Sequence, residues 1–513
     1  MEQLYNSKNI IIVELQEELQ KNIDIIEALF QDCDDIVKKE FRLLRGTEAV
    51  EAYMVYIDGL TDGDMVQEHV IGPLQRHHRP EEDVFEAFFH SEIDMADLKK
   101  ETSFDQTGNS ILRGDTALFI QGYAATIIIS SKNLPVRSIQ ESDTEAVMRG
   151  PRDSFNESLR TGTALIRRRI KDPKCKVVQN TFGERSRTDY ALVYMEDLVP
   201  DGLLERVKEQ LERYRTDAIY DSGMLEHYMH QKWYSPFPII QSTERPDKVA
   251  ASVLEGRVAI VVDNSPEVLL LPATYNTFFQ ASDDYYNQWS VATFARILRY
   301  IASLLAIGLP GFYVAITNYH LEMLPTDLLL AIAQARSGIT FPIVVEVLLM
   351  ELEFELLREA GIRLPGPMGN TIGIVGGLIV GQAAVEAGLV STIVVIVVAM
   401  TALASFTIPN ESFASAYRLL KFLMIILSAV WGLYGFVLGM LVLAIHLSGL
   451  TSYGVPYMVP AVSTAEGTSE SRKDFILRMP IYTMQHRPVF TKEGQRRRIR
   501  LIKPNQKSEN NPK

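Results

Sequence analysis

The feature that most constrains this chain of 513 residues is a long apolar region between about residues 291 and 460. Two of its stretches, Phe294–Thr317 and Leu419–Leu447, exceed the roughly 20 predominantly apolar residues that a helix needs to cross a bilayer. The other apolar stretches are shorter or interrupted by charged residues: 324–336, 341–357, 372–385 and 389–406. By that length rule, the region predicts an α-helical membrane domain with about four to six spans.

Charge separates this region from the rest of the chain. Residues 291–513 hold 19 Lys and Arg against 14 Asp and Glu, which leaves 32 and 50 for residues 1–290, a net charge of −18. Residues 1–290 are therefore predicted to be an acidic soluble region, and this excess argues against nucleic-acid binding. The chain has only two cysteines, Cys33 and Cys175, too few for a disulfide framework, which is typical of a reducing compartment. Because the first residues lack the features of a signal peptide, we expect this region on the cytosolic side of a membrane.

Residues 1–290 alternate between strand-like and helix-like stretches, which indicates an α/β region of two subdomains. The first, residues 1–135, is predicted to have helices at 4–30 and 84–99, a strand at 52–57, and a hairpin of strands at 116–121 and 125–131. The second, residues 136–290, is predicted to have strands near 176–179, 190–194, 257–262 and 268–271, and helices near 202–214, 224–229 and 249–255.

The soluble region contains none of the motifs that commonly mark catalytic or cofactor sites. The glycine-rich phosphate and dinucleotide motifs, the nucleophile elbow, the Cys-x-x-Cys pair and the zinc motif His-Glu-x-x-His are absent. His77 and His78 are adjacent, so they cannot both bind one metal ion from one face of a helix. We therefore expect no enzyme activity, no cofactor and no metal site.

An arginine-rich segment, residues 139–172, is the most distinctive part of the soluble region. It predicts a helix that begins near Asp153 and ends near Ile170. The run of three arginines at its end cannot share one helix face, because successive residues are about 100° apart. One interpretation is a solvated face with ion pairs to the acidic region. The other is a clamp between subunits or domains, made by Arg149, Arg152, Arg167, Arg168 and Arg169.

Four carboxylates interrupt a run of Val, Leu, Met and Phe in the apolar region: Glu346, Glu351, Glu353 and Glu355. Carboxylates at membrane depth are costly unless they face water, a partner or an ion path. Glu346, Glu351 and Glu353 are therefore candidates for an ion path. The alternative is a helix that lies along the membrane surface with its carboxylates in water. The spacing also permits an internal ion pair of Arg358 with Glu351 or Glu355.

Beyond a Pro-Gly-Pro break, glycines recur at every fourth residue: Gly369, Gly373, Gly377 and Gly381. Such spacing lets helix backbones approach closely in a membrane. Gly373, Gly377 and Gly381 are therefore candidates for helix packing. Gly435 and Gly439 repeat the spacing once in the last apolar stretch.

The C-terminal tail, residues 461–513, carries 12 Lys and Arg against 5 Asp and Glu, which predicts a cytosolic location. If the N-terminal region is cytosolic too, the number of membrane crossings is even. The polar, proline-containing end predicts a largely disordered tail. With the tail beginning at residue 461, the membrane domain is predicted to extend over residues 291–460.

A series of motifs running in order from about residue 111 to residue 460 resembles the A subunits of bacterial spore germinant receptors, the GerA family. The soluble motifs are Glu145–Arg152, Glu157–Arg160, Leu165–Ile170, Ser235–Pro238, Thr243–Lys248 and Asp284–Tyr286. The membrane motifs are Leu324–Thr326, Phe354–Gly361, Gly373–Gly377, Gly381–Val385 and Tyr453–Tyr457. The first hundred residues and the tail match loosely. Asn264 stands where the family pattern has glycine, and a turn accepts either residue.

The resemblance implies a multi-pass inner-membrane protein of dormant spores. It implies assembly with a transporter-like B subunit that senses the nutrient and with a lipoprotein C subunit. It also implies a homo-oligomer in the membrane lipid that opens as a cation channel when germination begins. Two alternatives stay open: a non-conducting scaffold that anchors and couples a nutrient-sensing partner, and nutrient binding by residues 1–290 themselves.

Overall fold

The computed structural model describes residues 14–45, 48–72, 84–87, 89, 97–133, 145, 149–230, 232–363, 377, 379–462 and 471–499. The chain divides into two compact units. The mixed unit comprises residues 1–230, 240–272 and 486–500, and the helical unit comprises residues 231–239, 273–485 and 501–513. The units therefore do not divide at residue 290 as the sequence predicts, because residues 231–239 and 273–290 belong to the helical unit.

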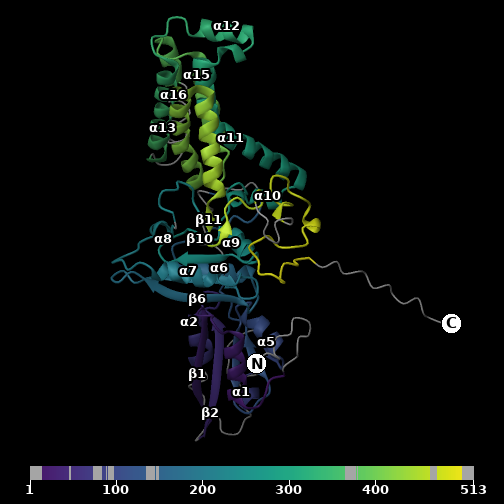
Figure 1. Cartoon of the computed structure of the whole chain (residues 1–513). Helices are drawn as coiled ribbons and strands as arrows, with labels where there is room; N and C mark the ends of the chain where they lie inside the picture. The colour runs from purple at the N-terminus through teal and green to yellow at the C-terminus, as the bar shows by residue number, and fades with distance from the viewer. Residues whose placement is uncertain are drawn as a thin grey trace, which may run out of the picture. The chain divides into compact units, whose positions relative to one another are not determined.

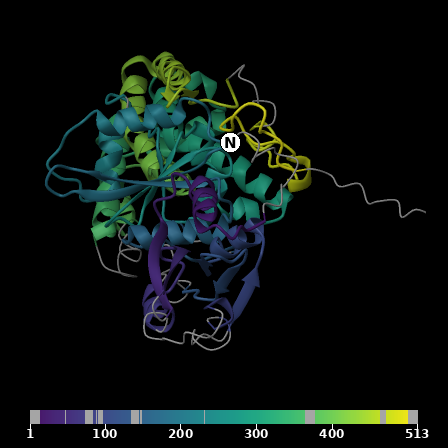
Figure 2. The same cartoon turned by 90° about the horizontal axis from the view of Figure 1, so that it is seen from below.

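The first half of the mixed unit, coloured purple to dark blue in Figures 1 and 2, contains one antiparallel sheet. The sheet has five strands in the order β1-β2-β4-β5-β3. Its strands are β1 (Ile36–Arg45), β2 (Glu48–Ile57), β3 (Leu98–Glu101), β4 (Thr116–Ile120) and β5 (Thr126–Ile129). Its helices are α1 (Leu19–Leu29), α2 (Gly63–Val66), η1 (Gln67–Ile71), α4 (Val84–Ala87) and α5 (Phe104–Ile111). The predicted hairpin is confirmed, because β4 pairs with β5. The predicted helix at 84–99 is described only as α4, and its last residues belong to β3.

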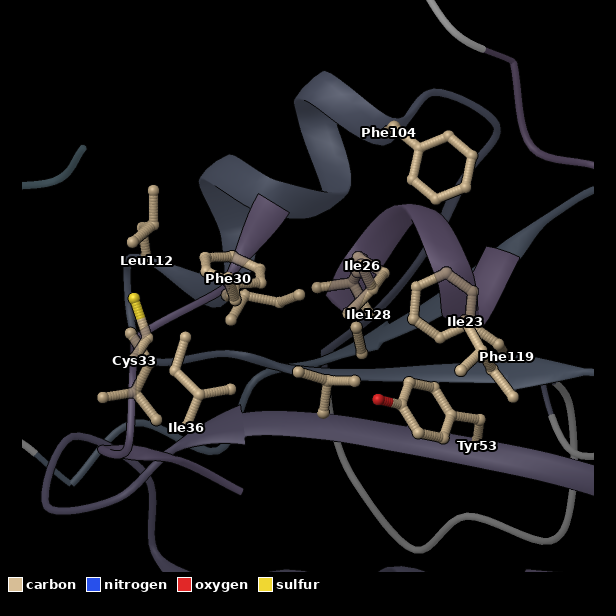
Figure 3. Packing of buried hydrophobic residues seen from close by; sticks show 14 of the residues in the cluster. Ile23, Ile26, Phe30, Cys33, Ile36, Tyr53, Phe104, Leu112, Phe119 and Ile128 are labelled. Carbon is tan, nitrogen blue, oxygen red and sulfur yellow. The ribbon is translucent and has the colours of Figure 1, made fainter. Parts of the chain in front are cut away.

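Side-chain alternation along β2 gives the first sheet a core on each face. Tyr53 lies in a cluster with Ile23 and Ile26 of α1 (Figure 3). The adjacent Met54 lies in a second cluster with Val66 of α2. Because both faces are covered, the strand is apolar at successive positions.

The second half of the mixed unit is another antiparallel sheet, in the order β6-β7-β9-β10-β8. Its strands are β6 (Cys175–Phe182), β7 (Thr188–Met195), β8 (Gln241–Thr243), β9 (Val258–Val262) and β10 (Val268–Leu271). Its helices are α6 (Leu159–Arg169), α7 (Leu203–Glu212), α8 (Ser222–Met229) and α9 (Pro246–Val253). The two sheets with their helices confirm an α/β N-terminal region, and β9 and β10 pair as predicted.

Helix α6 contributes to the cores of both sheets. Leu165 and Ile166 pack in the core of the second sheet, and Ala164 packs in the core of the first. A Cβ atom at Gly162 would lie 2.9 Å from Cγ1 of Val261 in β9, so a side chain there would collide with the sheet. Glycine therefore allows the close approach through which α6 joins the two sheets.

The helical unit contains α10 (Asp283–Tyr286), α11 (Trp289–Tyr319), α12 (Thr326–Ala335), α13 (Ile343–Arg363), α15 (Thr392–Phe406), α16 (Glu411–Ser448) and helical residues 379–386. Short elements are η3 (Tyr275–Phe278), η4 (Leu321–Met323), β11 (Thr451–Ser452), β12 (Val455–Pro456) and η5 (Ile481–Thr483). Val314 of α11, Val347 of α13, Val394 of α15 and Ile425 of α16 form one buried cluster, and these helices lie side by side in Figure 1. Within the described residues, α11 and α16 are long and apolar enough to cross a membrane by length and composition.

Helix α16 reverses direction at Gly432. The backbone there has φ 59° and ψ −138°, a conformation that glycine adopts and other residues rarely do. The Phe237 ring lies 5.7 Å from the ring of Phe413, near the start of α16, and 6.1 Å from that of His446, near its end. A straight helix would hold those two residues about 50 Å apart. Where the sequence predicts one continuous span, the structure therefore has two helical arms that fold back on each other.

Part of the tail that the sequence predicts to be disordered packs against the rest of the chain. Arg478 is 2% exposed in the helical unit, where its guanidinium donates to the carbonyl of Asn287 at 3.1 Å. Phe490 and Thr491 are buried in the mixed unit. Over residues 471–499, specific polar and apolar contacts thus replace the predicted disorder.

Candidate functional site

The carboxylates of α13 are the first candidates, and Glu346 is completely buried. Its Oε1 accepts a hydrogen bond from Nη2 of Arg336 at 3.0 Å, and its Oε2 accepts one from the backbone N–H of Ser391 at 2.9 Å. Ser391 is the N-cap of α15, so the carboxylate also meets the positive end of that helix dipole. Glu346 therefore has a cation and a helix terminus as partners within its own chain.

Lys421 of α16 joins two other carboxylates of α13. Its Nζ lies 2.6 Å from Glu351 Oε2 and 3.0 Å from Glu355 Oε1, and Lys421 and Glu351 are 3% and 1% exposed. The other oxygen of Glu351, Oε1, is buried without a hydrogen-bond partner in the described structure. Two carboxylates thus share one ammonium group, and Glu355 also lies within electrostatic reach of Arg358, which pairs with Glu411.

Glu353 points differently from Glu346 and Glu351. It is half-buried and makes no ion pair with any residue that the structure describes. Leu349, Leu352 and Leu356 on the same side of α13 are 41%, 57% and 63% exposed. The structure therefore does not bring the three predicted ion-path glutamates together: two are turned into the unit, and Glu353 lies on an exposed apolar stripe.

Glycines of the predicted ladder make looser contacts than the spacing indicates. A Cβ at Gly381 would lie 3.5 Å from Val395 and one at Gly377 would lie 3.9 Å from Leu357, both ordinary contacts, while Gly373 lies outside the described residues. The tighter approaches involve Gly311 of α11, where a Cβ would lie 3.1 Å from the Met424 carbonyl oxygen. The tightest approaches are at Gly435 and Gly439, where an added Cβ would meet the Leu427 carbonyl and, at 2.7 Å, Met424 Sδ in the other arm of α16. Among the described residues, close helix packing is therefore concentrated between α11 and α16 and between the two arms of α16.

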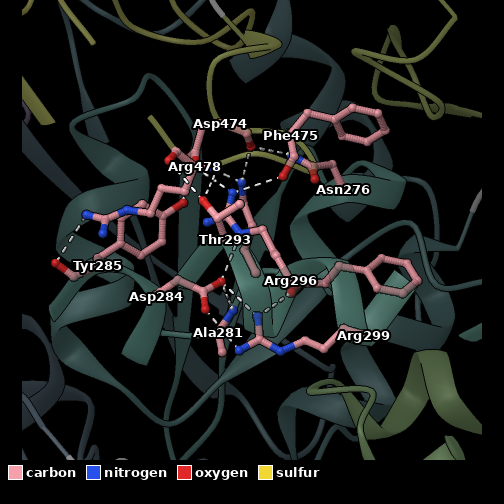
Figure 4. A network of polar contacts seen from close by, with 12 residues as sticks. Asn276, Ala281, Asp284, Tyr285, Thr293, Arg296, Arg299, Asp474, Phe475 and Arg478 are labelled. Atoms are coloured by element: carbon pink, nitrogen blue, oxygen red, sulfur yellow. Dashed lines mark hydrogen bonds and ion pairs between the residues drawn. The ribbon is translucent and has the colours of Figure 1, made fainter. Parts of the chain in front are cut away.

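A polar network surrounds the first turns of α11 (Figure 4). The buried guanidinium of Arg296 lies 2.9 Å from Asp284 and 2.6 Å from Asp474. Arg299 lies 2.8 Å from the same Asp284 carboxylate. The network attaches α10 and the tail residue Asp474 to the start of the apolar helix.

Several ion-pair partners of these charged groups were not predicted from the sequence. Lys421, Arg336 and Asp474 lie between 10 and 178 positions from the residues that they pair with. One signal was available for Lys421, because a lone lysine at the start of a long apolar stretch needs a carboxylate partner. In the described part of the chain, no three His, Cys, Asp or Glu side chains gather to hold a metal ion.

The predicted arginine clamp separates into different environments. Arg167 of α6 is completely buried and donates from Nε and Nη2 to Asp35 at 2.7 and 2.9 Å. Arg169 pairs with Asp153, and Arg168 is exposed. Arg149 and Arg152 are exposed as well. The Arg167–Asp35 pair links α6 to the first sheet.

Both cysteines lie near this pair. The Sγ of Cys33 is 3.7 Å from the carbonyl oxygen of Cys175, and both residues are buried as free thiols. Burial raises the pKa of Cys33 and raises that of Cys175 to about 12. Since the thiolate is the reactive form, both thiols are predicted to be unreactive in the folded mixed unit.

Comparison with known proteins covers most of the chain. The sequence profile described as Bacillus/Clostridium GerA spore germination protein matches residues 24–490. The chain is 38% identical over 476 residues to the uncharacterized membrane protein YfkQ of Bacillus subtilis (strain 168), which covers 93% of this chain and 92% of that protein. It is 40% identical over 471 residues to spore germination protein KA of the same organism, covering 92% and 86%. The crystal structure of the N-terminal domain of the A subunit of the Bacillus megaterium spore germinant receptor GerK3 aligns with 52% of this chain and 98% of that chain, at 25% identity and a TM-score of 0.41.

Proposed function

This chain belongs to the GerA family of spore germination proteins, as a membrane A subunit of a germinant receptor, and on that premise we propose that it oligomerises around a nutrient-gated cation path. The path would lie in the inner membrane of the spore, with the N-terminal region on the cytosolic side. A transporter-like B subunit would sense the nutrient, and a lipoprotein C subunit would complete the receptor.

The observation that carries this proposal is the incompletely partnered buried carboxylate of Glu351 on α13. Lys421 is shared by Glu351 and Glu355, and Glu351 Oε1 has no described partner. In a low-dielectric setting an uncompensated carboxylate attracts a cation or a proton. A neighbouring subunit or a permeating cation could therefore supply the missing positive partner.

Gating would require two arrangements of the charged helices. The contact of Lys421 with Glu351 and Glu355 joins α13 to α16, so a small shift of either helix changes how the charge is shared. Nutrient binding to the partner subunit would favour one arrangement, because a ligand shifts an equilibrium only by its differential affinity for the two states. Glu353, on the exposed stripe, is the proposed contact with a neighbouring subunit or with the path.

A non-conducting scaffold is the second candidate, and Glu346 favours it. Its carboxylate already has Arg336 and the N-terminus of α15 as partners, so within one chain it needs no ion. If all the carboxylates act in this way, α13 stabilises the bundle and transmits a signal without conducting.

Cation flux through vesicles containing the assembled receptor distinguishes the two candidates. The channel proposal predicts that Glu351→Gln and Glu353→Gln reduce flux at least threefold while assembly is retained, and that Glu346→Gln mainly lowers stability. Glu359→Gln is the matched control, because Glu359 lies on the same helix and is exposed beside Arg363. Unchanged flux in all three variants would remove these glutamates from the path, and absence of flux in the intact receptor would favour the scaffold.

A further inference from the structure

Helix α11 is longer than a bilayer is thick. Its 31 residues extend for about 46 Å at 1.5 Å per residue, whereas the hydrocarbon core is about 30 Å thick. We take the C-terminal end of the helix as one boundary, because Tyr319 packs against Gly432, where α16 reverses, and its hydroxyl donates to the Ala429 carbonyl at 2.6 Å. The excess, about ten residues, therefore falls at the N-terminal end of α11.

The first turns of α11 have a polar inner side and an apolar outer side. Arg296 and Arg299 hold the buried network on the inner side. Phe294, Leu298 and Ile301 on the outer side are 70%, 50% and 52% exposed. A helix with one charged side and one apolar side is suited to the boundary between lipid headgroups and acyl chains.

A segment of the tail, Phe475–Tyr482, is attached beside these turns (Figure 4). The Thr293 hydroxyl donates to the Arg478 carbonyl and accepts from the Arg478 backbone N–H, both at 3.1 Å, and Asp474 binds Arg296. With its polar groups directed inward, the segment exposes four apolar or aromatic side chains: Leu477 at 54%, Met479 at 43%, Ile481 at 56% and Tyr482 at 71%.

A loop of the helical unit also exposes large aromatic side chains. Trp233 and Tyr234 are 92% and 59% exposed. Their loop is held at the end of α16, where Lys232 donates to the Gly449 carbonyl at 2.9 Å and Ser235 lies 3.0 Å from the His446 ring nitrogen. Trp, Tyr and Lys side chains gather at membrane–water interfaces, where rings contact acyl chains and cations contact phosphates.

We propose that the tail segment Phe475–Tyr482 and the outer side of the first turns of α11 form one lipid-binding surface at the headgroup level of the cytosolic leaflet. The segment is a membrane-surface anchor and not a free cytosolic tail. Arg472, which precedes it and is exposed, supplies a positive charge that attracts anionic headgroups. The continuity of α11 with a membrane span favours lipid over a second copy of the chain as the occupant.

Tryptophan fluorescence can test this placement in the full-length protein. The chain has three tryptophans, Trp233, Trp289 and Trp431, and replacing each by Phe gives a background for a single reporter. In that background Tyr482→Trp is reconstituted in phosphatidylcholine–phosphatidylglycerol vesicles with bromine placed near the headgroup or near the bilayer centre. The expected result is quenching at least twofold stronger by the shallow bromolipid than by the deep one. Tyr220→Trp is the matched control, because Tyr220 of the mixed unit is 70% exposed, and acrylamide but not bromolipid should quench it.

Two results would overturn the proposal. Quenching of the Tyr482→Trp reporter by acrylamide alone, as in the control, would show a segment free in water. Protection from both acrylamide and bromolipids would show that a second copy or another subunit covers it. If the Phe background does not fold, native Trp289 in the Trp233→Phe/Trp431→Phe variant gives the same comparison for α11. None of these outcomes depends on whether the receptor conducts ions.

Discussion

Both units contain a buried cation at a junction between elements, but the two cations differ in the number of carboxylates that they contact. In the mixed unit, Arg167 meets one carboxylate, Asp35, through two hydrogen bonds. In the helical unit, Lys421 meets two carboxylates, Glu351 and Glu355. The first arrangement is a one-to-one pair, and the second shares one cation between two carboxylates.

This difference indicates different roles. A neutral, bidentate buried pair fixes one geometry, because either charge left alone would be strongly destabilising. A cation shared between two carboxylates can redistribute its contacts when a helix moves or when another cation approaches. We therefore expect Arg167 to hold a static junction and Lys421 to take part in a movable one.

Removing Lys421 should have the largest effect. Lys421→Met leaves Glu351 and Glu355 without a cation, and the expected loss of stability is about 4 kcal/mol, in the range for breaking a buried pair. Denaturant unfolding in detergent, followed by circular dichroism, measures it. Adding Glu351→Gln and Glu355→Gln should recover more than half of the loss, and failure to recover it would mean that packing of the lysine stem matters more than its charge.

Removing Arg167 tests the static junction. Arg167→Met is expected to cost about 3 kcal/mol, because Asp35 stays buried without its partner. The buried Cys33 and Cys175 should then react with a thiol reagent at least tenfold faster than in the wild type. The double variant Arg167→Met/Asp35→Leu should label almost as slowly as the wild type, and fast labelling there would contradict a purely electrostatic junction.

The glycines of the two units should respond differently to a methyl group. Gly162→Ala is expected to cost about 1–3 kcal/mol, because the added Cβ would lie 2.9 Å from Val261. Gly381→Ala, with 3.5 Å of space, should change monomer stability by less than about 1 kcal/mol. Unfolding of each variant gives the comparison. If Gly381→Ala disrupts the oligomer alone, the ladder packs between subunits and not within one.

The smallest expected effect is a pH dependence of the mixed unit. Burial, with Glu267 nearby, raises the pKa of Glu226 to about 7 from 4.5. The folded state therefore binds more protons than the unfolded state between these two pH values. The contribution of Glu226 to the free energy of unfolding is greatest below pH 4.5 and falls as pH rises from 4.5 through 7. Thiol labelling from pH 6 to 8, corrected for the intrinsic pH dependence of thiolate formation, should show more opening at pH 8. Glu226→Gln should remove that difference, and a wild-type profile without it would contradict the assignment.

Much of the mixed unit was predictable because its local patterns agree with its tertiary structure. The apolar runs at 116–121 and 125–131 form the expected hairpin of β4 and β5. Strand β1 was missed because Lys38, Lys39, Glu40 and Arg42 interrupt its apolar residues, and only pairing along the whole of β2 stabilises it. Propensity is a weak guide where cross-strand contacts decide the structure.

The candidate site was predictable in its residues and not in its geometry. The carboxylates of α13 stand out in an apolar sequence, but their partners Arg336, Ser391 and Lys421 come from three other segments. Helical spacing favoured Arg358 as the internal partner of Glu351 or Glu355. In the structure Arg358 pairs with Glu411 instead, because α13 lies beside the start of α16.

The sequence by itself determined the acidic N-terminal region, the apolar region and the family, because these depend on composition and on the order of short motifs. Only the tertiary structure decided that α16 reverses at Gly432, that residues 471–499 pack against the units, and that Glu353 is separate from Glu346 and Glu351. Each of these depends on contacts between residues far apart in the chain. Such contacts cannot be predicted from local sequence, because burial and charge pairing arise only when the helices are packed.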